Sequence, residues 1–529
     1  MATVVRCAVM TCAVALAATT CAADWSQWRG PERNGLVPDS PALIDAIPAD
    51  GLKPVWTSEK VPGGGSGGYG SVVVADGRAF VYSNTRYAVP IATRSLTKQG
   101  LARIGWSVGM PDELLARVEE ARTSAERKNL DRRAVRDWVN KWVGANLTRE
   151  QGAFRSGCSR RLTLGVAALP ADMCRKLETV VDKEFPTVDA LDRWLTENAF
   201  EGDARRSVLR AIPTTRNAAH DHVFCLDAAT GRTLWRKELP GTYTGYLSSS
   251  TPCIADGRCY VMGSGGNIYC LNVADGEVIW QAKGKTRPNE THASSIVVLD
   301  GLAVLLAGQL TALDAATGDI AWTQPEVVLR ESYSSAAYWR HEGATYLVVN
   351  GSRDACCVAP KTGEVLWKVP GGGWSTPAIV GDDMVIYSAR SRPGLVAYRL
   401  AMPAPRQAWS LPYRDRGASP VIRGGYVYAL GGGNDAHAVC VELESGKLAW
   451  DEKLRGAAEI ASPVEADGKL LGVVGSTLQI MATSPEGYRL LGEIDAKVTA
   501  CTSPAFVDGR VFLRLGDAVA CYDLRKDPN

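Results

Sequence analysis

The feature that most constrains the fold is a tryptophan that returns at a nearly constant interval. The steps of 41–45 residues join Trp235, Trp280, Trp322, Trp367, Trp409 and Trp450. A period of about 40–50 residues is typical of propellers and other repeat arrays. Most of these tryptophans follow a Thr-Gly, Asp-Gly or Ser-Gly turn, so each one closes a copy of a short structural unit.

A second series of turns runs in phase with the tryptophans. Asp-Gly or a close variant separates two alternating apolar runs at positions 76, 256, 300, 342, 382, 424, 467 and 508. Asp-Gly between such runs predicts a two-residue hairpin, because both turn residues need a positive φ. In the fifth copy the pair is Asp382-Asp383, and Met402-Pro403-Ala404-Pro405 replaces the turn before the tryptophan. The unit is therefore a four-stranded sheet whose last strand carries the tryptophan.

The sheets are expected to close into a ring, because one four-stranded sheet cannot bury both of its faces alone. The last copy ends at Cys521–Leu524 without a tryptophan strand, and an unattached strand, Lys53–Trp56, precedes the first copy. We therefore expect an all-β, eight-bladed β-propeller of four-stranded blades in which Trp56 completes the eighth blade. Trp56 and the six repeat tryptophans are interpreted as packing between blades and not as groups that stack on a cofactor.

A stretch without hairpin turns interrupts the first unit. Residues 90–219 carry helical patterns instead, at Asp112–Val118, Arg133–Val139 and Val188–Leu195. The expected domains are a signal peptide over 1–23, the start of the propeller over 24–89, a helical insertion over 90–219 and the rest of the propeller over 220–529. In a four-stranded blade the loop between the second and third strands leaves the ring at a mouth of the central channel. We therefore expect the insertion to overhang this mouth as a lid or as a platform for a partner.

The N-terminus has the pattern of a targeting segment. Arg6 precedes an apolar run from Cys7 to Ala18, and small residues lead to Ala23 before the first acidic residue. This pattern predicts a cleaved secretory signal and a periplasmic or secreted protein. A weak buried helix and a lipid anchor on Cys21 are the alternatives. The run is too short to span a membrane, and a net charge of +2 does not favour nucleic acid as a partner.

The 14 cysteines do not include a Cys-x-x-Cys-His motif, which disfavours attached haem. Five occupy one position of the third strand and are interpreted as buried thiols, with Ala312 in their place in the third unit: Cys225, Cys270, Cys357, Cys440 and Cys521. Cys158 and Cys174 are the candidates for a disulfide, and whether they are bridged is left open. A vicinal disulfide between Cys356 and Cys357, beside a quinone cofactor, is the alternative to one core cysteine with a chance neighbour.

The channel mouth is the default place for a ligand site. Side chains just before the first strand of each blade should line it, and these are Tyr69, His292, Glu331, Tyr333, Trp374, Arg416 and Glu459. This mixture suits a planar or polar ligand, and the alternative is that the residues are solvated or covered by the insertion. The five histidines form no strong metal-ligand motif, so neither a metal site nor a catalytic residue is assigned.

The segment Val223–Trp235 resembles the PQQ-type propeller repeat, and Asp24–Pro31 is similar to the opening of secreted bacterial proteins with this repeat. The resemblance covers about residues 24–82 and 220–524 and implies an eight-bladed fold. The repeat occurs in quinoprotein alcohol dehydrogenases, which use PQQ and Ca²⁺, and in outer-membrane-assembly propeller lipoproteins, which bind proteins. The resemblance is therefore specific for fold and not for activity.

Two functions remain after this comparison. We expect a non-catalytic scaffold that binds a protein, or an extracellular small molecule or saccharide, through the capped end of the ring. The alternative is a PQQ- and Ca²⁺-dependent dehydrogenase that oxidises alcohols or sugars. For that activity Glu331, Glu459 and Asn289 are loose candidates as metal ligands or base, and no cofactor is assigned with certainty.

Overall fold

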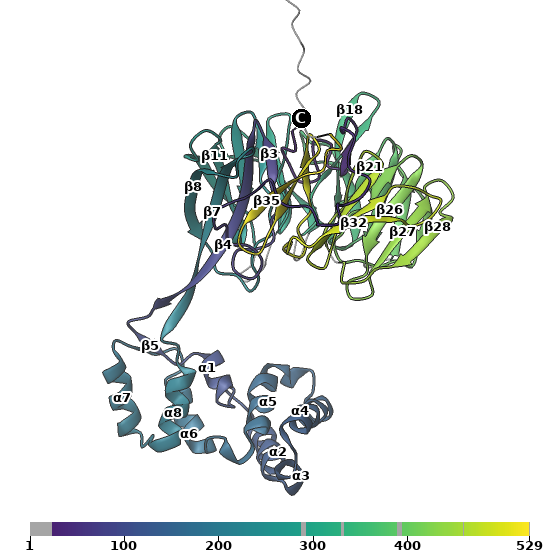
Figure 1. Ribbon diagram of the computed structural model, residues 1–529. Helices are drawn as coiled ribbons and strands as arrows, with labels where there is room; N and C mark the ends of the chain where they lie inside the picture. The colour runs from purple at the N-terminus through teal and green to yellow at the C-terminus, as the bar shows by residue number, and fades with distance from the viewer. Residues whose placement is uncertain (1–23, 287–292, 329–332, 389–393, 459, 528–529) are drawn as a thin grey trace, which may run out of the picture. The chain divides into compact units, whose positions relative to one another are not determined.

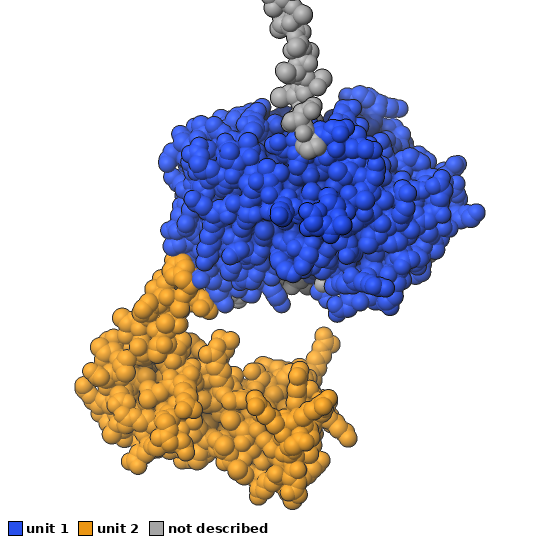
Figure 2. Space-filling model, in the orientation of Figure 1, with its two compact units in different colours: residues 1–86, 219–529 blue, residues 87–218 orange. Residues whose placement is uncertain are grey.

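The computed structural model describes residues 24–286, 293–328, 333–388, 394–458 and 460–527, so the expected signal peptide lies outside the described residues. The chain divides into two compact units, drawn in blue and orange in Figure 2. Residues 1–86 with 219–529 form the sheet unit, and residues 87–218 form the helical unit. The chain leaves the sheet unit within strand β4 and returns within strand β7.

Neighbouring strands of the sheet unit pair into a series of small sheets (Figure 1). Each sheet has four strands except one, which has five. The first sheet holds β3 (Val73–Ala75), β4 (Arg78–Pro90), β7 (Thr215–Asp227) and β8 (Thr233–Gly241). The second holds β9 (Cys253–Ala255), β10 (Arg258–Met262), β11 (Asn267–Asn272) and β12 (Val278–Lys283). The third holds β13 (Val297–Leu299), β14 (Leu302–Ala307), β15 (Gln309–Asp314) and β16 (Ile320–Val328). The fourth holds β17 (Ala337–His341), β18 (Ala344–Asn350), β19 (Asp354–Val358) and β20 (Val365–Pro370).

The second half of the sheet unit continues the pattern. The fifth sheet holds β21 (Ala378–Val380), β22 (Asp383–Ser388), β23 (Gly394–Arg399) and β24 (Arg406–Leu411). The sixth holds β25 (Val421–Arg423), β26 (Tyr426–Gly431), β27 (His437–Glu442) and β28 (Leu448–Lys453). The seventh holds β29 (Val464–Ala466), β30 (Lys469–Val474), β31 (Thr477–Ala482), β32 (Leu490–Ile494) and the parallel strand β1 (Leu36–Val37). The eighth holds β33 (Ala505–Val507), β34 (Arg510–Arg514), β35 (Val519–Asp523) and β2 (Trp56–Thr57). This mostly β architecture of four-stranded sheets is consistent with a β-propeller.

The hairpin turns form where the sequence places them, with one correction. Asp76 and Gly77 have φ values of 49° and 69°, as a turn with two positive φ angles requires. The fifth sheet differs, because Val380 pairs with Asp383 and the turn is therefore Gly381-Asp382. There the positive φ falls on Gly381, at 58°, which is typical of a turn that begins with glycine. The prediction of Asp382-Asp383 was wrong by one residue.

The tryptophan of each repeat packs on the sheet that follows. Trp56 pairs with Cys521, and its indole N–H donates to the carbonyl oxygen of Ala228 at 3.0 Å. Equivalent bonds of 2.8–3.1 Å join Trp235 to Val273, Trp280 to Ala315, Trp322 to Pro360, Trp409 to Leu443 and Trp450 to Ser484. The indole nitrogen of Trp367 has no partner among the described atoms. Trp367 packs on the fifth sheet, in which Met402–Pro405 replaces the glycine turn before the last strand. The small residues of the third strand lie directly opposite, Cys225 against Trp235 and Ala312 against Trp322.

The seventh sheet has no tryptophan at this position, and the N-terminal segment replaces it. Gly492 pairs with Ile480 where other sheets pair a tryptophan with a small residue. A Cβ on Gly492 would lie 2.4 Å from Cγ1 of Ile47, so Ile47 fills the space of the missing ring. The backbone N–H of Ile44 donates to the carbonyl oxygen of Leu524 at 2.8 Å, in place of the indole N–H.

A closed ring of hydrogen bonds joins the inner ends of the sheets. The backbone N–H of Ser71 donates to Oγ1 of Thr251 at 3.0 Å, and that of Thr251 donates to Oγ of Ser295 at 3.2 Å. The series continues at 2.8–3.2 Å through Ser335, Thr376, Ser419, Ser462 and Ser503 back to Ser71. We call these residues the hydroxyl ring. In the described residues, the segment just before β3, β9, β13, β17, β21, β25, β29 and β33 supplies one member each.

The segment from Trp25 to Val37 crosses the inside of this ring. It begins against the first two sheets, where Trp25 pairs with Val74 and the carbonyl oxygen of Ser26 accepts from Ile254 at 2.8 Å. It ends where β1 pairs with β29. The buried Arg33 donates to the carbonyl oxygen of Ala336 at 2.7 Å, and the buried Arg29 donates to that of Pro420 at 2.6 Å. The N-terminal segment thus holds together sheets that are far apart in the sequence.

The helical unit contains the helices expected from the sequence patterns. Its helices are α1 (Lys98–Arg103), α2 (Asp112–Thr123), α3 (Ala125–Lys128), α4 (Arg132–Asn146), α5 (Arg155–Leu164), α6 (Ala171–Glu178), α7 (Val188–Glu197) and α8 (Gly202–Ala211). Strands β5 (Arg94–Ser95) and β6 (Glu184–Phe185) form a two-stranded sheet. The three predicted helical segments lie in α2, α4 and α7.

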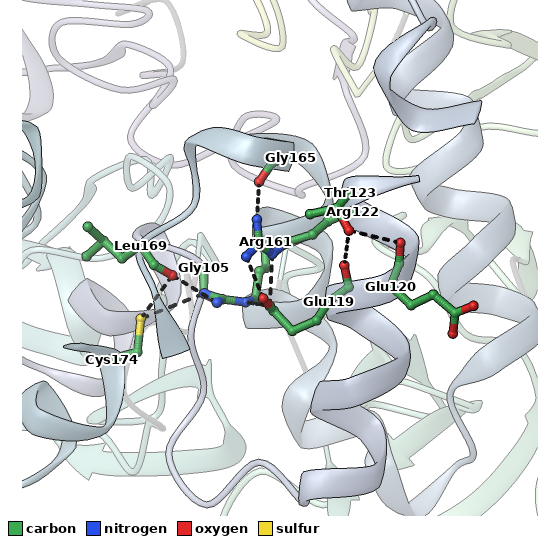
Figure 3. Close-up of polar contacts among 9 residues, drawn as sticks. All are labelled: Gly105, Glu119, Glu120, Arg122, Thr123, Arg161, Gly165, Leu169 and Cys174. Carbon is green, nitrogen blue, oxygen red and sulfur yellow. Dashed lines mark hydrogen bonds and ion pairs between the residues drawn. The ribbon is translucent and has the colours of Figure 1, made fainter. Parts of the chain in front are cut away.

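A buried arginine organises the polar core of the helical unit (Figure 3). Arg161 forms an ion pair with Glu119, donates to the carbonyl oxygen of Leu169 at 2.8 Å and lies 5.1 Å from the ring centroid of Trp106. Its guanidinium also contacts Sγ of Cys174 at 3.7 Å. Cys158 and Cys174 are both buried and free, so the candidate disulfide is not formed in this structure.

Cys356 and Cys357 are also free. They are successive residues of β19, and successive side chains of a strand point to opposite faces of the sheet. Cys357 accordingly packs in one apolar cluster with Trp367, whereas Cys356 packs in another with Val349. Burial raises the pKa of both thiols to about 12. Both cysteines are therefore core residues, and the vicinal disulfide is not formed.

Candidate functional site

The sheet unit contains a cavity of about 430 Å³ over the hydroxyl ring. Ser71, Thr251, Ser295, Ser335 and Ser503 of the ring line it. Aromatic side chains from the N-terminal segment and from the loops before the inner strands surround these hydroxyl groups: Trp28, Tyr69, Tyr246, Tyr333 and Trp374. Aromatic walls around a few placed polar groups are the usual composition of a binding site.

The structure brings four of the predicted rim residues together. Tyr69, Tyr333, Trp374 and Arg416 all line the cavity. His292, Glu331 and Glu459, which the sequence assigns to the same rim, lie outside the described residues. The loops before the inner strands therefore supply part of the wall of one cavity. That these residues bind a ligand stays a prediction.

The wall on one side is held in place by a contact between two tilted aromatic rings and by backbone hydrogen bonds. The rings of Tyr333 and Trp374 have centroids 4.4 Å apart at an angle of 43°. The backbone N–H of Trp374 donates to the carbonyl oxygen of Arg416 at 3.0 Å. Asp415 accepts from the backbone N–H groups of Gly417 and Ala418 at 2.8 and 2.6 Å, which orders the loop that carries Arg416. This part of the wall is thus organised before any ligand arrives.

Two residues of the cavity lining have a positive φ, a backbone conformation that residues other than glycine rarely adopt. Ile460 and Cys501 each have a φ of 69°. A positive φ is a genuine outlier for a β-branched residue such as isoleucine and costs on the order of 1–3 kcal/mol. Strain of this kind gathers at binding sites, where the surrounding structure imposes a geometry that the chain alone would not adopt.

Arginine side chains lie in the described lining of the cavity and behind it. The exposed Arg416 lines the cavity, and the buried Arg33 donates to the carbonyl oxygen of the lining residue Ser295 at 3.2 Å. Arg29 is also buried, and burial followed by repulsion from Arg33 lowers the pKa of Arg29 to about 9. Burial lowers the pKa of Arg33 as well. Carbonyl oxygens and the amide of Gln27 are the partners of these buried guanidinium groups, so their charge favours an acidic group in a ligand.

The described lining does not fit the metal of a quinoprotein dehydrogenase. Ca²⁺ is held by six to eight oxygen atoms, mostly from carboxylate and amide groups. The described lining residues provide hydroxyl groups, aromatic rings and a guanidinium, and none of them has a carboxylate or an amide side chain. Glu331, Glu459 and Asn289 lie outside the described residues.

The sequence interpretation missed the floor of the cavity. Ser/Thr-Pro pairs marked the starts of inner strands at Thr251, Thr376, Ser419, Ser462 and Ser503, but a shared hydroxyl role was not inferred. The members without a proline, such as Ser71, carry no comparable signal. Trp28 was noted only as part of the N-terminal motif, whereas its side chain lines the cavity.

Comparison with known proteins identifies relatives of the repeat region. A family model described as "Outer membrane protein assembly factor BamB" matches residues 214–337 and 337–466. The protein of that name from Yersinia pestis is 26% identical over 239 residues, which are 44% of this chain and 59% of the relative. The one from Moranella endobia is 23% identical over 291 residues, which are 52% of this chain and 64% of the relative. The chain thus spans less than two thirds of the length of these curated relatives.

Two solved structures match a little over half of this chain. BamB from Moraxella catarrhalis has a TM-score of 0.47 and 14% identity, over 58% of this chain and 90% of that one. Quinohemoprotein alcohol dehydrogenase from Comamonas testosteroni has a TM-score of 0.43 and 11% identity, over 59% of this chain and 73% of that one.

The match to the family model and to the curated relatives confirms the resemblance to the PQQ-type propeller repeat. Within the described residues, no helix combines the length and the apolar character that crossing a membrane requires.

Proposed function

We propose that this chain is a non-catalytic scaffold that binds a protein partner in the cavity over the hydroxyl ring. The observation that carries the proposal is the composition of the lining, in which Trp28, Tyr246 and Trp374 stand beside Arg416. Tryptophan, tyrosine and arginine are the residues that contribute most to protein–protein binding. Tyr246 is 69% exposed, so a partner has an apolar surface to cover.

The partner segment is expected to carry an apolar side chain that lies on the rings of Tyr333 and Trp374, whose planes meet at 43°. The similarity to proteins named outer membrane protein assembly factor supports a protein ligand. It gives no support to a saccharide.

We also propose how the sheets are arranged. The sheets are the blades of an eight-bladed propeller, the hydroxyl ring is its inner seam, and residues 90–219 are a helical insertion in the first blade. The closure of the hydrogen-bond series from Ser503 to Ser71 at 2.9 Å supports a ring. The insertion would act as a lid or as a partner platform at the mouth of the channel, and the chain would work in the periplasm or outside the cell after loss of its signal peptide.

The test is binding of periplasmic proteins to the purified full-length chain, with variants of the cavity. Trp374→Ala and Arg416→Ala should each weaken the recovery of a specific partner by at least about tenfold, since such anchor residues contribute about 2 kcal/mol or more. Tyr243→Ala is the matched control, because Tyr243 is an exposed aromatic residue that does not line the cavity. The control should bind as the wild type does.

Two results would contradict the scaffold proposal. One is a partner that binds the wild type and both cavity variants equally. The other is that the protein reduces a dye with alcohols after addition of PQQ and Ca²⁺, and that Trp374→Ala loses this activity. That result would establish the dehydrogenase instead.

A further inference from the structure

Two histidines and a glutamate converge on one face of the first sheet. His220 and His222 both lie on β7, and residues two apart in a strand point to the same face. Glu238 lies on the neighbouring strand β8, directly opposite His222 in the register. The residue between the histidines, Asp221, points into the opposite face, where it accepts from the hydroxyl of Tyr82 at 2.7 Å. Because side chains alternate along the strand, the structural carboxylate of Asp221 lies on one face of the sheet and the two imidazoles lie on the other.

The ligand atoms of the three side chains lie within 4.8 Å of one another. Nδ1 of His220 is 3.2 Å from Oε1 of Glu238, and Nδ1 of His222 is 3.8 Å from Oε2. In a tetrahedral zinc site with bonds of about 2.0–2.2 Å, ligand atoms are about 3.3–3.6 Å apart. The observed spacing is thus close to that of a site with two imidazoles and one carboxylate.

The hydrogen bonds of His222 orient its ring for such a role. Nη2 of Arg236 lies 3.4 Å from Nδ1 of His222, and a guanidinium can only donate. Nδ1 must therefore present a lone pair, and Nε2 carries the proton that it donates to Oγ1 of Thr85 at 2.8 Å. Metal-binding histidines are held in this way by a hydrogen bond from the nitrogen that faces away from the metal.

The cluster is buried at one end and open at the other. The side chain of His222 is 4% exposed, whereas that of Glu238 is 53% exposed, which leaves a path for an ion from solvent.

The guanidinium of Arg236 lies where a metal ion would compete with it. It is 3.4 Å from Nδ1 of His222 and 3.8 Å from Oε2 of Glu238. Arg236 is half exposed and lies 5.4 Å from the ring centroid of Phe224 in the same conformation, so its guanidinium can turn towards solvent when a metal enters.

We propose that His220, His222 and Glu238 form a binding site for one late first-row divalent metal ion such as Zn²⁺. Two imidazoles and a carboxylate are a common ligand set for zinc, and water completes the coordination. The site lies on the strands at which the chain returns to the sheet unit, and it is separate from the cavity, whose lining contains none of these residues.

The experiment titrates tag-free, full-length protein with Zn²⁺ by calorimetry and with Co²⁺ by visible absorption. One Zn²⁺ per chain should bind, and the Co²⁺ spectrum should show d–d bands without a thiolate charge-transfer band. His220→Gln and Glu238→Gln change exposed or half-buried side chains, and each should weaken binding about 100-fold, at least as much as loss of a supporting hydrogen bond does. Arg236→Gln should tighten binding several-fold, because it removes the competing cation.

The matched control is His437→Gln. Nδ1 of His437 lies 2.6 Å from Oδ1 of Asp451 on β27 and β28, so this pair has the same chemistry without a second imidazole. Its loss should leave Zn²⁺ affinity unchanged. The proposal is overturned if the wild type binds no stoichiometric Zn²⁺, if Glu238→Gln binds as the wild type does, or if Co²⁺ reports thiolate ligands.

Discussion

Removal of the Trp56 side chain should destabilise the sheet unit and release the N-terminal closing strand. Trp56 is 8% exposed, packs edge-on against Phe512 at 5.9 Å and donates its indole N–H to Ala228. Burial of an indole, about 150–250 Å², contributes about 4–6 kcal/mol as an upper bound. Measured tryptophan-to-alanine changes in cores cost about 3–5 kcal/mol. We therefore expect Trp56→Ala to lower the free energy of unfolding by about 4 kcal/mol, including about 1 kcal/mol from the lost hydrogen bond.

The assay is equilibrium unfolding in urea combined with hydrogen exchange read by mass spectrometry. Trp56→Phe is the matched control, since it keeps an aromatic ring against Phe512 and loses the indole N–H, and it should cost about 1–2 kcal/mol. In Trp56→Ala the amides of β35, which β2 covers, should exchange faster than those of β22 in the fifth sheet. A loss below about 1 kcal/mol, or equal exchange in β35 and β22, would refute the idea that this strand closes the structure.

Three further predictions concern single contacts. Gly318→Ala should lower the free energy of unfolding by about 2–4 kcal/mol, because the residue has a φ of 81° and the new Cβ would lie 2.6 Å from the ring of Trp280. The control is Gly301→Ala, which has a φ of 76° and open space around the new Cβ, and it should cost only about 1 kcal/mol. Thermal or urea unfolding measures both. Glu119→Gln should cost about 3–5 kcal/mol by leaving the buried Arg161 without its counter-charge, whereas the exposed Glu120→Gln should stay within about 0.5 kcal/mol. The lowered pKa of His222, about 4, makes the folded state bind fewer protons than the unfolded state below pH 6.5, so stability falls as pH falls from 6.5 to 4. His222→Gln should remove about 3 kcal/mol of that fall. The measurement compares the free energy of unfolding of the wild type and of the variant across this pH range. If the two curves run parallel, burial does not lower the pKa of His222.

The repeat could be predicted because its signals are local. A turn such as Asp76-Gly77 needs only its own two residues and the alternating runs beside it. The tryptophan spacing set the order of the strands, and the pairing of Trp56 with Cys521 followed from a missing strand at one end and a spare one at the other. The fifth sheet shows the limit of this reasoning, since Asp383 resembles a turn residue and yet begins β22.

The inner part of the structure could not be predicted in this way. The segment that carries Arg29 and Arg33 has no period, and its partners Pro420 and Ala336 are 391 and 303 residues away. Ile47 replaces a missing tryptophan only because it is brought beside Gly492 by the fold. These contacts depend on which surfaces the closed ring leaves open, and that information is not contained in any short window of sequence.

The candidate site was predictable in position and not in chemistry. Residues before the inner strands had to lie together, which placed Tyr333, Trp374 and Arg416 on one wall. The five histidines, with His220 and His222 among them, form no strong metal-ligand motif in the sequence. The proposed site of these two depends on Glu238, whose position opposite His222 follows from the register of β7 and β8. A strand-period search for histidine pairs would have found the pair.

Photo-crosslinking from the cavity rim tests the scaffold proposal most directly. A benzophenone amino acid at position 246, in place of the exposed Tyr246, should form a covalent adduct with a discrete protein in the cells that make this chain. The same group at position 320, in place of Ile320, which is 57% exposed on strand β16 outside the cavity, should not. Adducts from position 320 with none from position 246 would contradict the account.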